Sequence, residues 1–246
     1  MRKAGFLITL VCLLAASNFT LADTFGTGAN QFTLDFVTIY GLSNPARVVY
    51  AGNFAFEGVR NDYRIGKFEI TNSQWNKFKA AYGTVTGSAR DAYNANPYYP
   101  GANVPTNMTS WLEAAQFVNW LNTSKGYQAA YKFTGTIHTT DYTFSPWSAS
   151  DPGYNPANPF RNSNAFYFLP TENEWMKAAY WNGKSLQTYA TKAGTSLYQG
   201  NGSNGGWNYF YNGDDGPAGS ATGPWNVGSG SEELNGTYDM MGNIQE

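Results

Sequence analysis

Three helix capping boxes constrain this chain more than any other feature of its sequence. Each box is a Ser or Thr followed three residues later by Glu or Gln, a pattern in which both side chains satisfy backbone amides at a helix start. The boxes begin at Thr71, Ser110 and Thr171. Apolar residues follow each box at helical spacing, and Gly83 and Gly183 stand where the first and third helices are expected to end. The sequence therefore predicts three short helices.

Between the predicted helices the pattern is extended or irregular. Alternating apolar residues predict strands over 32–39 and 63–70, and a short apolar run covers 165–169. Three long stretches are rich in Gly, Asn, Pro, Ser and Tyr, and loops of that length are normally functional or disordered. These stretches are residues 84–104, 139–164 and 184–231.

Aromatic side chains offer a way to order such loops. Phe, Trp and Tyr make up 17% of the chain and charged residues only 13%, against about 25% charged residues in a typical soluble domain. We therefore expect much ordered irregular coil held by aromatic anchors, with few long helices or strands. No internal repeat or low-complexity linker divides the chain, so one domain is expected.

The N-terminus has the features of a secretory signal peptide. A basic start over residues 1–3 precedes an apolar run over 6–16 that only Thr9 interrupts, and small residues at 20–22 offer a cleavage site. The run is short for a membrane-spanning helix, although an uncleaved anchor is the alternative. The domain is therefore expected over residues 23–246 of a secreted or periplasmic protein, with no membrane span after cleavage.

Cleavage there would leave a weakly acidic segment without cysteine. Losing Arg2 and Lys3 leaves 13 of the 15 basic residues against 17 acidic ones, a net charge of about −4. This balance disfavours nucleic acid as a partner, because little positive charge is left to counter phosphates. Cys12, the only cysteine, would also be lost, so no disulfide would hold the domain.

Several catalytic chemistries lack their residues in this sequence. His138 is the only histidine, which disfavours zinc and non-haem iron sites built from several nitrogen ligands. No G-x-S-x-G motif supplies a hydrolase nucleophile. Glu172 and Glu174 are paired carboxylates, but acids in the first turn of a helix are favoured by its dipole. We identify no catalytic residue in this chain.

Five segments of the chain carry a family resemblance. They are IGKFEITNSQW, VPTNMTSWLEAAQFVNWLN, FLPTENEWMKAAYW, the Asn-Val-Gly step and GTYDMMGNIQE, at residues 65–75, 104–122, 168–181, 226–228 and 236–246. In this order they resemble the sulfatase-modifying factor domain, the family of the formylglycine-generating enzyme. The resemblance implies an α+β fold related to C-type lectins, with little regular secondary structure and long ordered loops. In that family the last motif continues into a further long segment, so the resemblance also implies a domain that is incomplete at its C-terminus.

The resemblance further implies two structural calcium sites. One would be formed by Asp239, Gly242, Ile244 and Glu246. The other would be formed by the side chains of Asn208 and Asp215 with the carbonyl oxygens of Tyr209 and Pro217. Ca²⁺ takes six to eight oxygen ligands and suits this mixture of carboxylates and carbonyls. Two alternatives stay open: Asp239 caps backbone amides in a packed turn, and residues 212–216 form a solvated turn in which Asp214 competes with Asp215.

Two functions from different classes follow from the resemblance and the composition. In the resembling enzymes, O₂ oxidises a cysteine of a partner protein, such as a sulfatase, to formylglycine, and two cysteines hold copper. The resemblance places that pair beyond Glu246, so it implies this activity, and copper, only if a further segment carries the pair.

The alternative is a non-catalytic, calcium-stabilised lectin-like module that binds carbohydrate or peptide. Aromatic residues in the loops are candidates for such binding, or else they anchor those loops. These residues are Tyr98, Tyr99, Trp147, Trp207 and Trp225.

Overall fold

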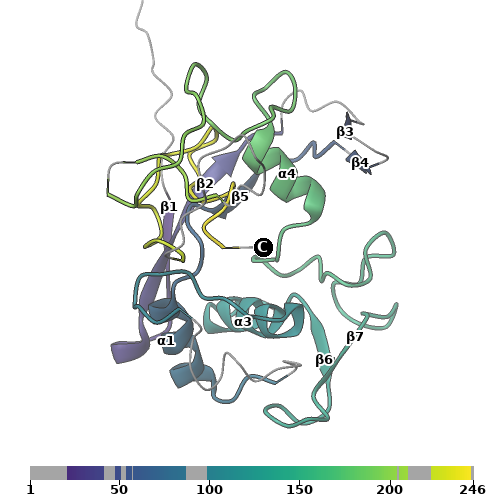
Figure 1. Ribbon diagram of the computed structural model, residues 1–246. Helices are drawn as coiled ribbons and strands as arrows, with labels where there is room; N and C mark the ends of the chain where they lie inside the picture. The colour runs from purple at the N-terminus through teal and green to yellow at the C-terminus, as the bar shows by residue number, and fades with distance from the viewer. Residues whose placement is uncertain are drawn as a thin grey trace, which may run out of the picture.

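The computed structural model describes residues 21–41, 48–50, 54–56, 58–86, 99–203, 205–209 and 223–244. Its three-stranded sheet is antiparallel, with the order β1-β2-β5 (Figure 1). The strands are β1 (Leu21–Phe25), β2 (Phe32–Ile39) and β5 (Tyr63–Gly66), and a short 3-10 helix, η1 (Gly28–Asn30), joins the first two. Two hairpins pair β3 (Val48–Tyr50) with β4 (Phe54–Phe56) and β6 (Lys132–Thr134) with β7 (Thr143–Ser145).

The strand predictions are confirmed in part. The strand over residues 32–39 is confirmed at both of its ends. The strand predicted over 63–70 ends early at Gly66, where the backbone bends away from the sheet. There the Lys67 N–H still donates to Asp35 O of β2 at 2.8 Å, whereas the Lys67 carbonyl accepts a hydrogen bond from the Tyr238 N–H of a distant segment at 3.0 Å. The apolar run over 165–169 forms no strand.

All three predicted helices are present, and each has its capping box. They are α1 (Asn72–Tyr82), α3 (Trp111–Ser124) and α4 (Glu172–Tyr180). In α1, the Gln74 N–H donates to Thr71 Oγ1 at 3.1 Å, and the Thr71 N–H donates to Gln74 Oε1 at 2.9 Å. The local sequence is sufficient to place these starts because both partners of each box lie within four residues.

The helix ends follow the prediction in one case and not in the other. Gly83 ends α1 with a positive φ of 101°, a conformation that glycine adopts without a Cβ penalty. In contrast, α4 ends at Tyr180, before the predicted Gly183. Trp181 is extended, with φ −81° and ψ 114°, and forms an antiparallel bridge with Leu186. The pairing of that bridge ends the helix before the glycine.

Strand β2 contributes to hydrophobic clusters on both of its faces. Phe32 and Leu34 belong to one cluster, which includes the fully buried Trp75 and Phe78 of α1 and the buried residues of α3. Val37 and Ile39 belong to the other, together with Ala178, Ala179, Ala190 and Met240. Figure 1 accordingly shows α1 and α3 near one end of the sheet and α4 near the other.

Buried asparagines attach the irregular segments to the helices. Asn122, which is 0% exposed, donates to the carbonyls of Val118 and Tyr167 at 3.0 and 2.8 Å, and accepts from the N–H groups of Phe166 and Tyr167 at 2.8 and 3.0 Å. Asn119 likewise bonds both the N–H and the carbonyl of Tyr131, at 2.9 and 2.8 Å. Side-chain amides thus satisfy backbone groups that a neighbouring strand would otherwise satisfy.

The predicted signal peptide lies mainly outside the described residues and stays a prediction. Leu21 and Ala22, at the predicted cleavage site, form the start of β1 and pair with Phe36 and Asp35. Within the described ranges, no helix is both long enough and apolar enough to cross a lipid bilayer.

Candidate functional site

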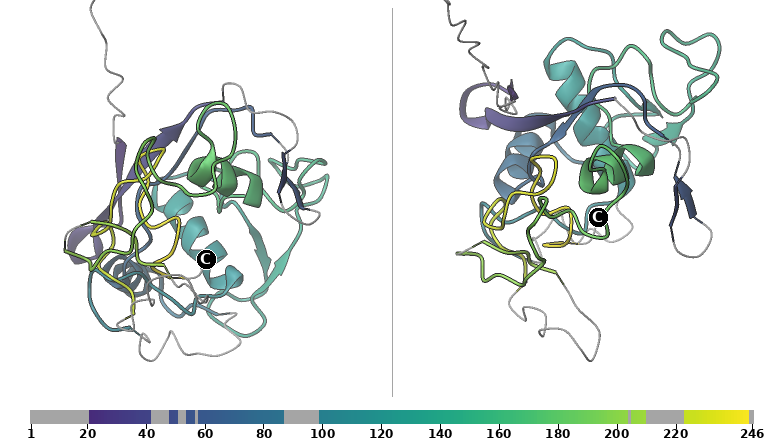
Figure 2. Two further views of the ribbon diagram at one scale, coloured as in Figure 1. Left: turned by 45° about the horizontal axis from the view of Figure 1, so that its top comes forward. Right: turned by 90° about the horizontal axis from the view of Figure 1, so that it is seen from above.

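Two irregular segments, described over residues 184–203 and 205–209 and over residues 223–244, run together in every view of the molecule (Figures 1 and 2). Backbone hydrogen bonds join them: the Leu234 N–H donates to Ala190 O at 2.7 Å, and the Ser231 N–H donates to Gly206 O at 2.8 Å. The Ser231 hydroxyl in turn accepts from the Gly206 N–H at 2.8 Å. The predicted calcium ligands that the structure describes lie within these two segments.

Asp239 is a buried carboxylate at the start of the final turn. Its backbone is in the left-handed region, with φ 68°, and its Oδ2 accepts from the Gly228 N–H at 3.0 Å. Burial raises the pKa of Asp239, and the Gly228 amide offsets part of that rise. This contact is the backbone-amide cap that Asp239 was expected to form if it does not bind calcium. It does not preclude a cation, because a nearby positive charge stabilises the ionised form of a buried carboxyl group.

Asn208 and Tyr209 lie against the turn at Gly242. The Asn243 N–H donates to Asn208 O at 2.6 Å, and the Asn208 side-chain amide donates to Asn243 Oδ1 at 3.1 Å. A Cβ at Gly242 would lie 2.1 Å from Asn208 O, so this close approach requires glycine. The structure thus brings together residues from the two predicted calcium sites.

The remaining predicted ligands cannot be placed. Asp215, Pro217 and Glu246 lie outside the described residues, and Ile244 is the last residue described. In the part of the chain that the structure describes, no three His, Cys, Asp or Glu side chains gather as a metal site. Among the described residues, the predicted ligands beside Asp239 are carbonyl and Asn oxygens, which are ligand types that Ca²⁺ accepts.

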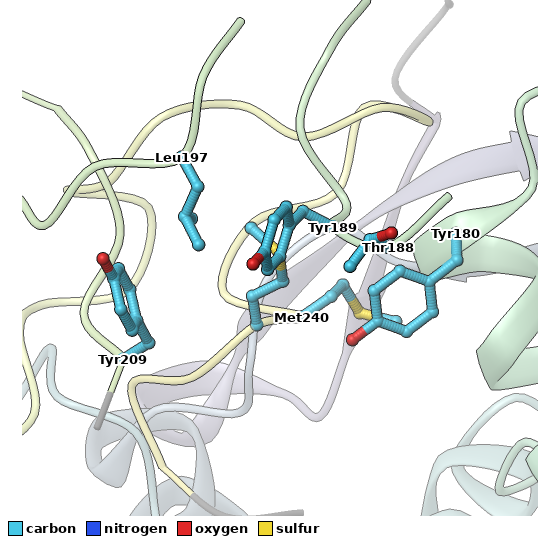
Figure 3. Close-up of a pocket in the computed structure, with 7 residues that line it drawn as sticks. Tyr180, Thr188, Tyr189, Leu197, Tyr209 and Met240 are labelled. Atoms are coloured by element: carbon cyan, nitrogen blue, oxygen red, sulfur yellow. The ribbon is translucent and has the colours of Figure 1, made fainter. Parts of the chain in front are cut away.

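A pocket of about 320 Å³ opens next to the same turn (Figure 3). Its lining residues carry no formal charge. They are Tyr180, Thr188, Tyr189, Leu197, Tyr209, Met240 and Met241. Figure 3 shows the rings of Tyr189 and Tyr209 on either side of the Leu197 side chain. Three phenol rings and two thioethers make a lining that is mostly apolar, with few polar groups to orient a ligand.

Hydrogen bonds fix the wall of the pocket that carries Thr188 and Tyr189. The Gln187 N–H donates to Tyr180 O at 2.9 Å, and its side-chain amide donates to the carbonyls of Tyr189 and Thr191 at 3.1 and 3.0 Å. The Ala190 N–H donates to Met241 Sδ at 2.9 Å. This wall is therefore hydrogen-bonded both to Tyr180 at the end of α4 and to Met241 in the final turn.

The opposite wall, from Leu197 to Tyr209, is also held by ordered contacts. The Trp207 N–H donates to Tyr198 O at 3.1 Å, and the rings of these two residues meet edge to face with centroids 5.7 Å apart. The Gly200 N–H donates to Trp207 O at 3.2 Å. Because both walls have their own anchors, the pocket is formed before any ligand enters.

Of the loop aromatics considered from sequence as binding residues, the four that the structure describes serve as anchors. Trp207 and Trp225 are buried, and Trp147 donates its indole N–H to Ala130 O at 3.1 Å. Tyr99 packs so closely on Gly223 that a Cβ there would lie 2.6 Å from its ring, and Tyr98 lies outside the described residues. Their bulk is used to order the loops rather than to form an exposed face.

His138 and Glu174 of α4 also have structural partners. Nδ1 of His138 lies 2.7 Å from Thr84 O, and its ring meets Tyr82 edge to face. Glu174 forms a bidentate pair with Arg161, at 3.1 and 3.0 Å. Burial alone would raise the pKa of Glu174, but the hydrogen bonds from Arg161 and from the Thr171 backbone keep it below the usual value.

Sequence reasoning missed the pocket itself. Its tyrosines, Tyr180, Tyr189 and Tyr209, follow no helical or strand period, so no local pattern relates them. The adjacent Met240 and Met241 were visible within the last family motif, but nothing in that motif marks them as a pocket floor. Only the return of residues 223–244 onto 184–209 brings these side chains together.

Comparisons with known proteins found one family model and a solved structure of similar fold. A family model described as "Sulfatase-modifying factor enzyme 1-like domain" matches residues 47–246. Among solved structures, the chain is similar to Treponema denticola variable protein 1, with a TM-score of 0.58 and 20% sequence identity over 93% of this chain and 76% of that one. No curated protein matched the chain.

Proposed function

Because the chain belongs to the sulfatase-modifying factor enzyme 1-like domain family, we propose that it is a secreted or periplasmic binding module built on that α+β fold. Recognition takes place in the tyrosine-methionine pocket, and calcium bound at the neighbouring turn stabilises the module. The observation that carries the proposal is the preformed pocket of about 320 Å³ between two anchored segments. Such concave, mostly apolar pockets with few polar groups are typical ligand sites.

The location and the finer fold are part of the same proposal. The basic and apolar leader over residues 1–16 supports export. A small antiparallel sheet that packs against helices and carries long ordered loops supports a C-type-lectin-like variant of the fold. Long loops fixed on such a scaffold are a common place for binding residues.

Calcium binding is supported by the position of the final turn. The carboxylate of Asp239 is buried, and the backbone of residues 208–209 meets that of Gly242 within the same region. Ions that bind the folded state alone stabilise it by mass action. Calcium would thus hold together the floor of the pocket, since Met240 and Met241 belong to this turn.

Formylglycine formation is the second candidate, and family membership is what favours it. The copper of that reaction would need two thiolates, which suit a soft Cu(I) ion. Among these 246 residues the only cysteine is Cys12, in the predicted leader. The residues present therefore do not fit a copper pair, and we derive no redox step for this chain. The proposal applies to a protein in which a further segment supplies the pair.

Immobilised glycans and peptides test the binding module. The full chain should bind a subset of them in calcium-containing buffer, and Tyr189→Ala should lose that binding because it removes one wall of the pocket. Tyr40→Ala is the matched control, since Tyr40 is 59% exposed and Tyr189 48% exposed. Binding that survives Tyr189→Ala unchanged would place recognition elsewhere.

A separate experiment tests formylglycine formation. The protein is incubated with copper, O₂ and a cysteine-containing peptide from a sulfatase, and the peptide mass is measured. Conversion of the thiol to an aldehyde by these 246 residues alone would contradict the assignment of this chain to binding.

A further inference from the structure

We propose that the tyrosine-methionine pocket is an aromatic cage for the quaternary ammonium group of a small soluble molecule, a cation of the choline type. This inference rests on the proposed function, because it takes the pocket as the recognition site. What it adds is the ligand class. The argument depends on the kind of side chains in the lining, their fixed positions and the charges around them.

The lining suits a cation that donates no hydrogen bonds. The face of each tyrosine ring carries partial negative charge, which attracts a cation placed within about 6 Å of the ring centre. Three such rings contribute to the lining, and Met240 and Met241 add soft, polarizable sulfur. A quaternary ammonium group presents only methyl groups, so it can be desolvated here without leaving a donor unpaired.

A neutral sugar would fit this lining less well. Its hydroxyl groups each need a hydrogen-bond partner once they leave water, since a buried unpaired polar group is costly. The polar side-chain groups of the lining are the hydroxyl of Thr188 and the three phenol hydroxyls. These few groups cannot satisfy a ring of hydroxyls, whereas they are sufficient to orient one polar end of a small cation.

The geometry of the pocket does not depend on the ligand. Gln187 and Met241 hold the Tyr189 wall, and the Tyr198–Trp207 contact holds the Tyr209 wall. In Figure 3 the rings of Tyr189 and Tyr209 stand apart, with Leu197 between them at one end. Anchored backbone walls reduce the entropy lost on binding, which helps weak cation–ring contacts to yield useful affinity.

The basic residues near the pocket are partly compensated. Lys192 is the basic residue closest to Tyr189 along the chain, and its ammonium group is paired with the carboxylate of Glu232. Lys67 lies 3.9 Å from the same carboxylate. The single carboxylate of Glu232 therefore offsets one of these two positive charges. The cavity is also at the small end of ligand pockets, which favours a free small molecule over a larger headgroup assembly.

Calorimetric titration of the full chain with choline and with its neutral carbon isostere, 3,3-dimethylbutan-1-ol, tests the cage. The two ligands have the same shape and differ in charge. Choline should bind about tenfold more tightly, because a desolvated cation–ring contact contributes about that much. Tyr189→Phe, which keeps the ring face, should retain choline binding, and Tyr189→Leu should weaken it about fivefold or more. Tyr40→Leu is the control for loss of an exposed tyrosine and should change nothing.

The outcomes separate the cage from the wider proposal. Equal binding of choline and its isostere, lost in Tyr189→Leu, would overturn the cage and retain an apolar recognition pocket. Absence of binding by both ligands would overturn the cage, and the glycan and peptide comparison would then decide the pocket independently. Binding to phosphatidylcholine vesicles without binding of free choline would overturn the assignment to a soluble ligand.

Discussion

Some residues of this protein have structural roles that their local sequence does not indicate. Asp239 occupies a left-handed backbone position, accepts a hydrogen bond from Gly228 and has a raised pKa because it is buried. A carboxyl whose folded pKa lies above its unfolded value opposes folding once it ionises, so its unfavourable contribution grows as pH rises through the unfolded pKa. A bound cation would reverse this effect.

Asp239→Asn should separate the structural role of this residue from its predicted role in calcium binding. Asn keeps an oxygen for the Gly228 N–H and removes the charge, so without calcium the melting temperature at neutral pH should be unchanged or higher. Millimolar calcium should raise the melting temperature of the natural protein and leave that of Asp239→Asn unchanged. The charge-matched control is Asp35→Asn, which should keep the calcium shift. A full shift in Asp239→Asn would contradict the predicted ligand.

Asp151 provides the opposite pH dependence. Hydrogen bonds from Lys132, at 2.6 Å, and from the Ser148 backbone, at 2.7 Å, lower the pKa of Asp151 to about 2. Its contribution to stability is therefore complete above its ordinary pKa of 3.8 and is lost as pH falls through about 2. Denaturant unfolding of Asp151→Asn should show a shallower loss of stability over this acid range. Parallel curves for the two proteins would contradict this assignment.

At the scale of elements, the helices and the loops are specified in different ways. Each helix begins at a capping box whose two members are neighbours in sequence, and an Ala at such a cap costs about 1 kcal/mol. The loops depend on asparagines that face outward from a helix into another segment. Asn122 alone bonds backbone groups of three residues, two of them more than 40 positions away.

Asn122→Ala should destabilise the protein by about 3 kcal/mol or more, because it leaves several buried backbone groups without partners. The matched control is Asn182→Ala. Asn182 accepts hydrogen bonds from Lys184 and Ser185 in an exposed turn, and its loss should cost within about 1 kcal/mol. Chemical denaturation gives both values. Similar losses for the two variants would show that burial does not set the contribution of Asn122.

At the scale of the whole molecule, β2 couples two hydrophobic clusters. Phe78, which is 0% exposed, packs against Trp75, Phe117 and Trp120 in one cluster, with ring centroids 5.1, 5.1 and 5.5 Å away. The other cluster joins α4 to the pocket floor through Met240. Because one strand serves both, loss of either cluster should disrupt the whole domain.

Phe78→Ala should therefore lower stability by about 3–5 kcal/mol and keep a single unfolding transition. Far-UV circular dichroism follows the secondary structure and tryptophan fluorescence follows the tertiary packing of helices and loops, and the two curves should coincide. The exposed control Tyr40→Ala should change stability within about 0.5 kcal/mol. Separate transitions for the two signals would show that the clusters unfold independently.

Much of the secondary structure could be predicted, and little of the candidate site. Helix starts and the strand over 32–39 depend on patterns within about ten residues. The end of α4 and the early end of β5 could not be predicted, because each results from a bridge or hydrogen bond to another segment, at Leu186 and Tyr238. The loop tryptophans were correctly weighed as anchors, whereas the pocket tyrosines were not identified.

The sequence by itself determined where helices begin, which family the chain resembles and that its loops would need internal anchors, since all three depend on residue types at short or fixed spacing. Only the tertiary structure decided which aromatics are buried and which line a pocket. It also brought Asn208 against Gly242, and Tyr189 and Tyr209 into the lining of one pocket. The physical reason is that irregular segments are fixed by side-chain to backbone hydrogen bonds between distant positions, and no periodic pattern records those partners.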